Sequence, residues 1–247
     1  MNQQKVITIP ELDKEGHDTL DAIASADKFN RWMFETIHPY IKDKILEIGS
    51  GIGNISAFLL ETKKSVTLSD YNEQYCNILR DKFALFPNLS SILSIDLVDQ
   101  QFDKKFAALL GSFDTIIALN VVEHIKDHNQ AIANCKKLLR KDGLLIILVP
   151  AYQGLYNRFD KELGHYRRYT IKKLNAVMSK HLTMIHNQYF NFSGIAGWFV
   201  SGAILRKKII PSSQMKFYNK LVPLFRIIDK VLFNKTGLSV IGIGKKD

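Results

Sequence analysis

The feature that most constrains the fold is a glycine-rich loop, Glu47 to Gly53, with the sequence Glu-Ile-Gly-Ser-Gly-Ile-Gly. It follows a short apolar run, residues 44–48, and leads into a helix-like segment, residues 52–61. Glycine permits a tight turn and a close approach of the backbone to a ligand, and the start of a helix offers unpaired N–H groups. The loop therefore predicts a strand–turn–helix unit with a ligand at the turn.

The spacing after this loop favours an adenosine-containing ligand other than a nicotinamide dinucleotide. Gly53 falls one residue early for the dinucleotide fingerprint, and Asn54 stands in its place. Asp70 follows the first glycine by 21 residues and ends the next apolar run, where a carboxylate suits two ribose hydroxyls. Asp96 ends the third run, where a carboxylate can accept from an adenine amino group. In the alternative without a ligand, the loop is a plain strand–helix turn and Asp70 is a helix cap.

Strand-like and helix-like segments alternate along the chain. The expected strands are residues 44–48, 65–68, 91–95, 113–119, 144–149, 184–190 and 238–243. The expected helices are residues 16–40, 52–61, 73–86, 127–140, 170–180 and 217–233. This alternation predicts a parallel sheet with right-handed crossovers, and such sheets bind ligands beyond the carboxyl ends of their strands. The polar residues at those ends are Glu47, Asp70, Asp96 and Asn120.

The composition is ordinary for a soluble globular protein, since 46% of the 247 residues are hydrophobic and 23% are charged. This length fits one large α/β domain. The two cysteines, Cys76 and Cys135, lack the spacing of a metal site or a disulfide framework, so we expect a cytoplasmic protein. Residues 1–10 do not resemble a signal peptide, and the longest apolar stretch, residues 192–205, is too short to span a bilayer.

The loop 47–53, Asp70, Asp96 and residues 113–124 together resemble the successive motifs of class I S-adenosylmethionine (SAM) dependent methyltransferases, over residues 15–150. This resemblance implies one α/β domain, 1–247, with a Rossmann-like, doubly wound seven-stranded sheet whose last strand, 238–244, is antiparallel. It also implies an N-terminal helix and a helical insertion near the C-terminus. The SAM-binding core is then 15–150, and residues 151–237 form the acceptor side.

The resemblance further implies that residues at the strand ends contact SAM. The predicted cofactor contacts are Glu47 for the ammonium group; Gly49, Ser50, Gly51 and Gly53 for the methionine part; Asp70 for the ribose; Tyr71, Asp96 and Leu97 for adenine; and Asn120 near the sulfonium.

Glu123 and His124 follow the fourth expected strand and allow two interpretations. They belong to a plain surface loop, or they resemble the Glu-His pairs of ubiquinone-type O-methyltransferases, some of which use a metal ion there. In that pattern an acid stands where this chain has Asn120. We therefore predict no metal site, and His124 remains a candidate general base.

The most distinctive segment, residues 152–169, follows the fifth expected strand and contains Gly-His-Tyr-Arg-Arg-Tyr. Similar stretches occur in a subgroup of bacterial methyltransferases, some joined to glycosyltransferases, and the family layout puts this one over the active-site mouth. Because imidazole titrates near neutrality and guanidinium clamps phosphate or carboxylate, His165 is a candidate base and Arg167 or Arg168 a candidate clamp. In the alternative, the His and Arg side chains pair with Asp160 and Glu162 and only hold the loop shut. The predicted acceptor contacts are Tyr152, Tyr156, His165, Tyr166, Arg167 and Arg168.

The net charge of +10 is concentrated after Val200, where there are ten Lys or Arg and two acids. An apolar stretch followed by the basic run 206–208 is typical of an interfacial helix, which predicts peripheral contact with an anionic membrane. In the alternative, Trp198, Phe199 and Ile204 pack into the core and the lysines are merely solvated.

These patterns predict a SAM-dependent methyltransferase that acts on a small molecule, with anionic and lipid-linked acceptors included. The alternatives are an RNA methyltransferase, suggested by the basic C-terminal region, and a SAM-binding protein without turnover. No separate RNA-binding module is visible, and residues 120–123 read Asn-Val-Val-Glu instead of the Asn-Pro-Pro-Tyr type motif for base amines. Nucleic acid is therefore not expected as a partner.

Overall fold

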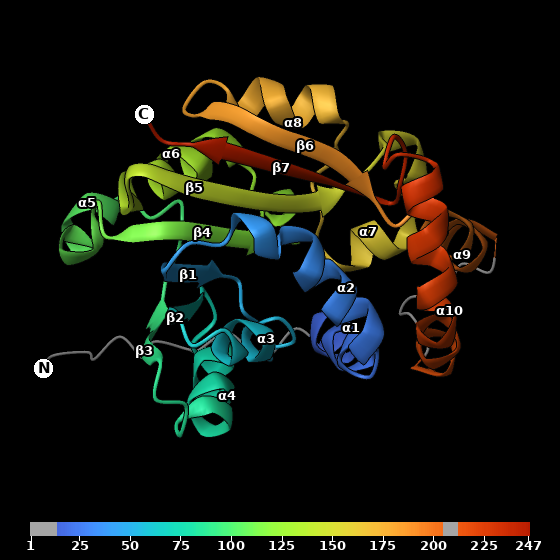
Figure 1. Cartoon of the computed structure of the whole chain (residues 1–247), viewed down its shortest axis with the longest axis horizontal. Coiled ribbons are helices and arrows are strands. Elements are labelled where there is room, and N and C mark those ends of the chain that lie inside the picture. Colours follow the sequence, from blue (N-terminus) through green and yellow to red (C-terminus); the bar gives the residue numbers. More distant parts are fainter. Residues whose placement is uncertain (1–13, 205–211) are drawn as a thin grey trace, which may run out of the picture.

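The structure is a computed structural model that describes residues 14–204 and 212–247. Its centre is a seven-stranded sheet in the order β3-β2-β1-β4-β5-β7-β6 (Figure 1). The strands are β1 (Lys44–Ile48), β2 (Ser65–Asp70), β3 (Leu89–Ser94), β4 (Phe113–Leu119), β5 (Leu139–Pro150), β6 (Thr183–Phe190) and β7 (Ser239–Lys245). Only β7 runs antiparallel to its neighbours, β5 and β6. The predicted doubly wound sheet with an antiparallel last strand is confirmed.

Helices cover both faces of this sheet. They are α1 (Lys14–Ala24), α2 (Asp27–Ile37), α3 (Ser56–Glu61), α4 (Glu73–Phe83), α5 (Phe102–Lys105), α6 (His128–Leu138), α7 (Arg158–Glu162), α8 (Ile171–Met178), α9 (Gly194–Trp198) and α10 (Ser212–Val231). One apolar core joins the sheet to α6 and α8, and the other joins it to α2, α3, α4 and α10. The central strand β4 and residues 144–150 of β5 are buried on both sides, which explains their nearly continuous apolar sequences.

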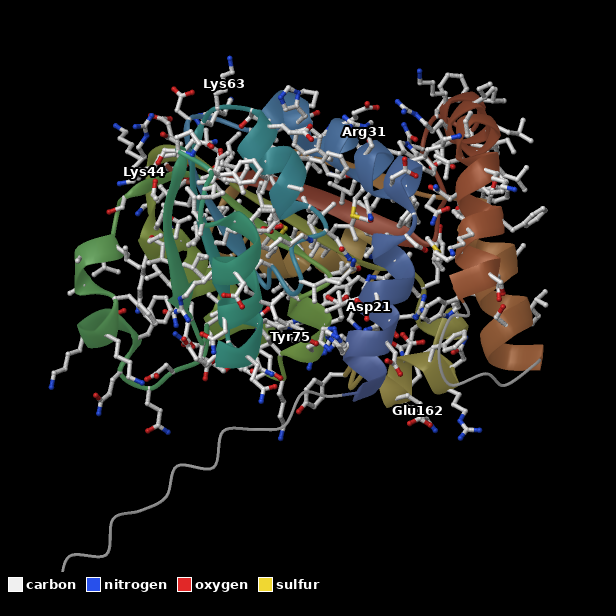
Figure 2. All side chains as sticks on the ribbon, turned by 90° about the horizontal axis from the view of Figure 1, so that it is seen from below. Asp21, Arg31, Lys44, Lys63, Tyr75 and Glu162 are labelled. Carbon is white, nitrogen blue, oxygen red and sulfur yellow. The ribbon has the colours of Figure 1, made fainter. Side chains whose placement is uncertain are left out.

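The carboxyl ends of the parallel strands point toward the part of the molecule where α1, α7, α9 and α10 gather (Figure 1). Figure 2 also places these helices away from the starts of the strands, because Lys44 at the start of β1 lies far from Asp21 of α1 and Glu162 of α7. The N-terminal helices and the C-terminal insertion between β6 and β7 therefore surround the edge at which α/β sheets bind ligands.

Several helix boundaries differ from the prediction. The expected helix 16–40 is two helices, because the chain turns at Ala26 and Asn30 Nδ2 donates a hydrogen bond to the Ile23 carbonyl near the end of α1. The expected helix 52–61 begins only at Ser56, after a turn that contains two glycines with positive φ. The apolar stretch 192–205 is divided between α9 and a π-helix, Phe199–Ile204, and the basic run 206–208 lies outside the described residues.

Two expectations from the composition concern cysteines and membrane spans. Cys76 and Cys135 are buried free thiols. Among the helices of the described residues, none combines the length and the hydropathy that crossing a bilayer requires.

Candidate active site

The glycine loop leaves β1 in a conformation that side chains oppose. Gly49 and Gly53 have φ angles of +69° and +84°. A Cβ atom at Gly49 would lie 2.4 Å from a methyl group of Val121, and one at Gly53 would lie 2.4 Å from the ring of Phe83. The loop is also tied to β2, because the Ser50 N–H donates to the Ser69 carbonyl over 2.8 Å. These two glycines are therefore required by the turn and by close packing against the following elements.

Glu47 lies on β1 just before this turn and is buried. Its carboxyl accepts a hydrogen bond from Ser56 Oγ over 2.5 Å. Burial raises the pKa of Glu47 to about 7, against the lowering effect of hydrogen bonds from Ser56 and Ser50. A buried carboxyl that has no cationic partner among the described residues suits the ammonium group of SAM, because that charge favours the ionised form.

Asp70 ends β2 and closes the glycine loop from the other side. Its two carboxyl oxygens accept from the N–H groups of Gly51 and Asn72, each over 3.0 Å. Burial raises the pKa of Asp70, although these hydrogen bonds favour its ionised form. Since each carboxylate oxygen has a second lone pair, Asp70 keeps acceptor capacity for ribose hydroxyls.

The residues predicted to contact adenine follow β2 and β3. The ring of Tyr71 is 72% exposed. Asp96 is exposed, and its carboxyl accepts from the Val98 N–H over 2.9 Å. Leu97 is buried, and its carbonyl accepts from Asn134 Nδ2 over 2.9 Å. The exposed Tyr71 and Asp96 are thus accessible to a nucleoside, and their roles remain predictions.

Asn120 begins the loop after β4 and has a φ angle of +55°, a left-handed conformation that asparagine tolerates. Its N–H donates to the Leu148 carbonyl of β5 over 2.8 Å, and its side chain is exposed. The next residue, Val121, contacts the glycine loop, and the predicted place of Asn120 near the sulfonium remains a prediction.

Helix α1 covers the glycine loop, which sequence reasoning missed. A Cβ atom at Gly51 would lie 3.0 Å from Leu20 Cδ1, and Asn54 Nδ2 donates to the Leu20 carbonyl over 3.0 Å. The rings of His17 on α1 and Tyr75 on α4 stack with 6.1 Å between their centroids. The helical periodicity of α1 predicts a buried face without specifying that the face lies on this loop.

The segment 152–169 folds back on the loop after β4, since the Tyr166 N–H donates to the Glu123 carbonyl over 2.9 Å. Within the segment, Asp160 is fully buried. One of its carboxyl oxygens accepts from Arg168 Nε and contacts His165 Nδ1, each over 2.8 Å. Burial opposes ionisation of Asp160, but the hydrogen bond from His165 and the charge of Arg168 outweigh it and lower the pKa.

Glu123 and His124 meet His165 at this junction. Each can offer one atom such that the three atoms lie within 4.8 Å of one another, a spacing that a metal ion can bridge. Both carboxyl oxygens of Glu123 are buried without a hydrogen-bond partner among the described residues, and burial raises the pKa of Glu123 to about 8. Protein atoms around His124, together with neighbouring His165, lower the pKa of that imidazole to about 4, although the residue keeps exposed surface. At neutral pH the Glu123 carboxyl is therefore protonated and His124 is neutral. The absence of a metal ion at this cluster stays a prediction.

The predicted acceptor contacts divide into two groups. Tyr166 is exposed, and Arg167 is partly exposed with its guanidinium donating to the Lys126 carbonyl over 2.8 Å. Tyr152 stacks on Tyr189 with 5.0 Å between ring centroids, and the Tyr156 hydroxyl donates to the His165 carbonyl over 2.8 Å. These tyrosines therefore hold the segment in place, and their contact with an acceptor remains a prediction.

The structure corrects the prediction for Arg168. Its side chain is 1% exposed. It pairs with Asp160, donates to the Ala151 carbonyl over 3.0 Å and lies 4.5 Å from the centroid of the Trp198 ring. A guanidinium that is buried and fully engaged in this way is not available to clamp a phosphate or carboxylate of an acceptor. For this residue the alternative, in which the segment is held shut internally, is correct.

Comparison with known proteins supports the same class. Residues 46–145 match the family model described as a methyltransferase domain. A 104-residue stretch is 31% identical to the reducing polyketide synthase Preu2 of Preussia isomera; it covers 41% of this chain and only 4% of the synthase. The chain thus spans a small part of the curated relatives that it matches.

Two solved structures share the fold over most of their length. The Thermotoga maritima SAM-dependent methyltransferase described as a possible histamine N-methyltransferase is 12% identical with a TM-score of 0.62, covering 95% of this chain and 97% of that one. The Burkholderia thailandensis 1,6-didemethyltoxoflavin-N1-methyltransferase is 16% identical with a TM-score of 0.60, covering 94% and 84%.

Residues 46–145 thus match a methyltransferase domain, and the seven-stranded sheet has the fold of solved SAM-dependent methyltransferases. The cofactor of such domains is SAM, and the buried acids Glu47 and Asp70 flank the loop that is predicted to bind it.

Proposed function

We propose that the protein transfers the methyl group of SAM to a small-molecule acceptor, with anionic and lipid-linked molecules as the leading classes. The observation that carries this proposal is the junction of the cofactor loop with the His165 segment: Val121 contacts Gly49, and two residues later Glu123 contacts Tyr166. A buried imidazole held by a carboxylate, in a segment that contacts the loop after β4, supports methyl transfer over SAM binding alone. The segment also supports membership of the subgroup with the Gly-His-Tyr-Arg-Arg-Tyr sequence.

Small-molecule chemistry also draws support from the names of similar proteins. They include polyketide synthases and 1,6-didemethyltoxoflavin-N1-methyltransferase. Neither name identifies the acceptor of this chain.

SAM supplies an activated methyl group on a sulfonium centre. The residues of this chain bind and align it: Glu47 with the ammonium group and Asp70 with the ribose, as their burial and position at the strand ends suggest. Alignment of acceptor and cofactor can remove roughly 7–11 kcal/mol of the barrier. Strong catalysis therefore does not require a base for every class of acceptor.

For a hydroxyl acceptor, we propose His165 as the general base. Because ionised Asp160 accepts from Nδ1 over 2.8 Å, neutral His165 has its proton on Nδ1 and a lone pair on Nε2. Nε2 can take the acceptor proton while the oxygen attacks the methyl group. His124, neutral at pH 7 because its pKa is about 4, is the second candidate.

The test is incubation of the purified protein with isotopically labelled SAM and a cell extract, followed by mass spectrometry of small-molecule, lipid and RNA fractions. We expect label in the small-molecule or lipid fraction. Asp70→Ala should abolish it, whereas Asp81→Ala, at an exposed aspartate of α4, should not. Label confined to RNA would identify an RNA methyltransferase instead, and no label in any fraction would leave a SAM-binding protein without turnover.

A further inference from the structure

Helix α10 presents an apolar stripe to solvent. Its members are Phe217, Leu224, Ile227 and Val231, which are 65%, 54%, 59% and 67% exposed. Residues 217, 224 and 231 are spaced by two helical turns, and residue 227 is one turn from 224, so all four lie on one side of the helix. The opposite side is buried through Met215, Val222 and Asp229. Side chains project outward from the free side of α10 in Figure 2.

Cations accompany this stripe. Lys220 falls within it by helical spacing, and Lys216 and Lys230 follow along one border; all three are exposed. Lysines in such positions lay their aliphatic stems along apolar surface and keep their ammonium groups at its rim. The free side of α10 thus combines an apolar strip with positive charge.

A groove of about 380 Å³ continues the positive charge between α10 and α2. Its lining consists of four cations and three apolar residues: Lys28, Arg31, Arg226, Lys230, Val222, Pro223 and Ile227. Of the four cations, Arg226 is paired with Glu35 over 2.7 Å. A groove of this composition suits a phosphate group attached to an apolar chain.

We propose that this face of α10, with the adjoining groove, docks on the surface of an anionic lipid bilayer. The four apolar residues enter the interface, and Lys28, Arg31, Lys216, Lys220 and Lys230 contact lipid phosphates. A second copy of the chain fits less well, because a two-fold contact would bring the lysines of the two stripes together. Helix α10 lies at the same edge of the sheet as the cofactor loop (Figure 1), so docking would hold the active site close to the membrane.

This location differs from the one that the sequence indicated. Trp198, in the apolar stretch before residue 205, packs inward: Nε1 donates to the Leu155 carbonyl over 3.2 Å, and its ring lies 5.0 Å from that of Phe159. Phe199 and Val200 beside it are 49% and 45% exposed, so only part of this stretch packs inward. The membrane surface is assigned to the helix that follows because four exposed apolar residues lie there in one stripe. This inference goes beyond the proposed function, because binding is measured without methyl transfer.

The test is co-sedimentation of the full chain with vesicles of phosphatidylcholine alone or mixed with an equal amount of phosphatidylglycerol, at low and high salt. We expect binding to the anionic vesicles, weakened by salt, and little binding to neutral ones. The double variant Lys220→Gln, Lys230→Gln should bind the anionic vesicles at least tenfold more weakly, because each lysine contributes about fivefold to the affinity. The double variant Leu224→Gln, Ile227→Gln should also lose at least tenfold.

Matched surface controls are Lys63→Gln, at an exposed lysine far from α10 in Figure 2, and Leu85→Gln, at a leucine that is 96% exposed. Both should bind as the unchanged protein does. No binding to anionic vesicles, or equal loss in the controls, would overturn the proposal. So would sedimentation of the vesicle-free protein as a dimer that the α10 variants dissociate, because the stripe would then be a self-interface.

Discussion

At the scale of single residues, the two buried acids around the cofactor loop are prepared for different partners. Asp70 is held in place by two backbone N–H groups, which favour a fixed, ionised acceptor. Among the described residues, the hydrogen-bond donors to Glu47 are the hydroxyl groups of Ser56 and Ser50, and burial raises its pKa to about 7. Binding of a cationic ligand group therefore releases a proton from Glu47, and this makes SAM affinity dependent on pH.

For Glu47, we expect SAM affinity to rise about tenfold from pH 6 to pH 7.5, since one pKa unit corresponds to a tenfold change in the ionised fraction. Above about pH 8 the affinity should fall again, because the amino group of SAM itself loses its proton. Calorimetry across this range, in buffers of different ionisation enthalpy, measures both affinity and proton release. Glu47→Gln should bind weakly and without the rise; a flat profile in the unchanged protein would contradict this role.

For Asp70, removing the carboxylate should weaken SAM binding by about 2–4 kcal/mol, at about 1.5–3 kcal/mol for each hydrogen bond to a charged group. Part of the loss reflects the loop, because Asp70 also holds the Gly51 N–H. Calorimetry on Asp70→Ala, with Asp81→Ala as a surface control, measures the effect. Unchanged affinity in a folded Asp70→Ala variant would rule out the ribose contact.

For His165, we expect replacement by alanine to lower turnover by about 10²–10⁴-fold for a hydroxyl acceptor, the usual contribution of a general base. SAM affinity should change little, because His165 is held by Asp160 and lies outside the glycine loop. Steady-state kinetics and calorimetry on the same variant separate the two effects. If turnover persists with the true acceptor, His165 only holds the segment.

Among these residues, sequence spacing located those at strand ends and left open those brought together by irregular segments. Glu47 and Asp70 end apolar runs, and parallel strands bring such ends to one edge of a sheet. Asp160 was named only together with Glu162, as one of two acids that could pair with the His and Arg side chains. It lies in a five-residue helix, and only the fold shows that both His165 and Arg168 return to it. Glu123 was recognised as one of a pair with His124, but its complete burial could not be seen from the sequence.

At the scale of elements, the segment 152–169 is organised by its short helix α7. Asn157 and Asp160 form a capping box: the Asn157 side chain accepts from the Phe159 N–H, and Asp160 accepts from the Asn157 N–H, each over 2.9 Å. Asp160 therefore fixes the helix start with one carboxyl oxygen and holds His165 and Arg168 with the other. Adjacent arginines in this segment consequently have different roles.

For the two arginines, Arg168→Ala should destabilise the protein by about 3–5 kcal/mol, because it leaves the buried charge of Asp160 without its partner. Arg167→Ala should cost less than about 1 kcal/mol, since Arg167 is partly exposed and its hydrogen bond to the Lys126 carbonyl lies at the surface. Thermal and denaturant unfolding of both variants measures the difference. Equal stability of the two would contradict the assignment of Arg168 as a structural residue.

Regular elements were predictable to the extent that their residues carry a local signal. The strands β1, β4 and β5 are apolar because both faces are covered, and Thr170 caps α8 by accepting from the Lys173 N–H. The break between α1 and α2 was missed because the turn at Ser25 and Ala26 contains neither glycine nor proline. Its cause is tertiary: Phe29 N–H donates to Asn219 of α10, nearly two hundred residues away.

At the scale of the whole molecule, two buried carboxyls and His124, near the cofactor loop and acceptor segment, act together on stability. Burial raises the pKa of Glu123 from 4.5 to about 8 and that of Glu47 from 4.5 to about 7. Burial and His165 lower the pKa of His124 from 6.5 to about 4. Between pH 4.5 and its raised pKa, each carboxyl is protonated in the folded chain and ionised in the unfolded chain. Each therefore lowers the free energy of unfolding as pH rises through this range.

His124 acts in the opposite direction, because between pH 4 and 6.5 the unfolded chain binds the proton that the folded chain lacks. The contribution of His124 to the free energy of unfolding therefore rises with pH up to 6.5. Over this range it offsets the loss of stability from one of the two carboxyls. Above pH 6.5 this offset has ended, while Glu123 continues to lose its favourable protonation until about pH 8. The net result is a fall in stability over this upper window.

We expect the free energy of unfolding to fall by on the order of 1–2 kcal/mol between pH 6.5 and 8, since each pKa unit corresponds to about 1.4 kcal/mol. Glu123→Gln keeps the shape of the side chain without a titrating proton, and it should remove most of this fall. Glu61→Gln, at an exposed glutamate of α3, should leave it unchanged. Denaturant unfolding at several pH values in the absence of SAM measures the slope. The same slope in Glu123→Gln would mean that Glu123 is already ionised at neutral pH, and a bound cation at the cluster with His124 and His165 would then have to be sought.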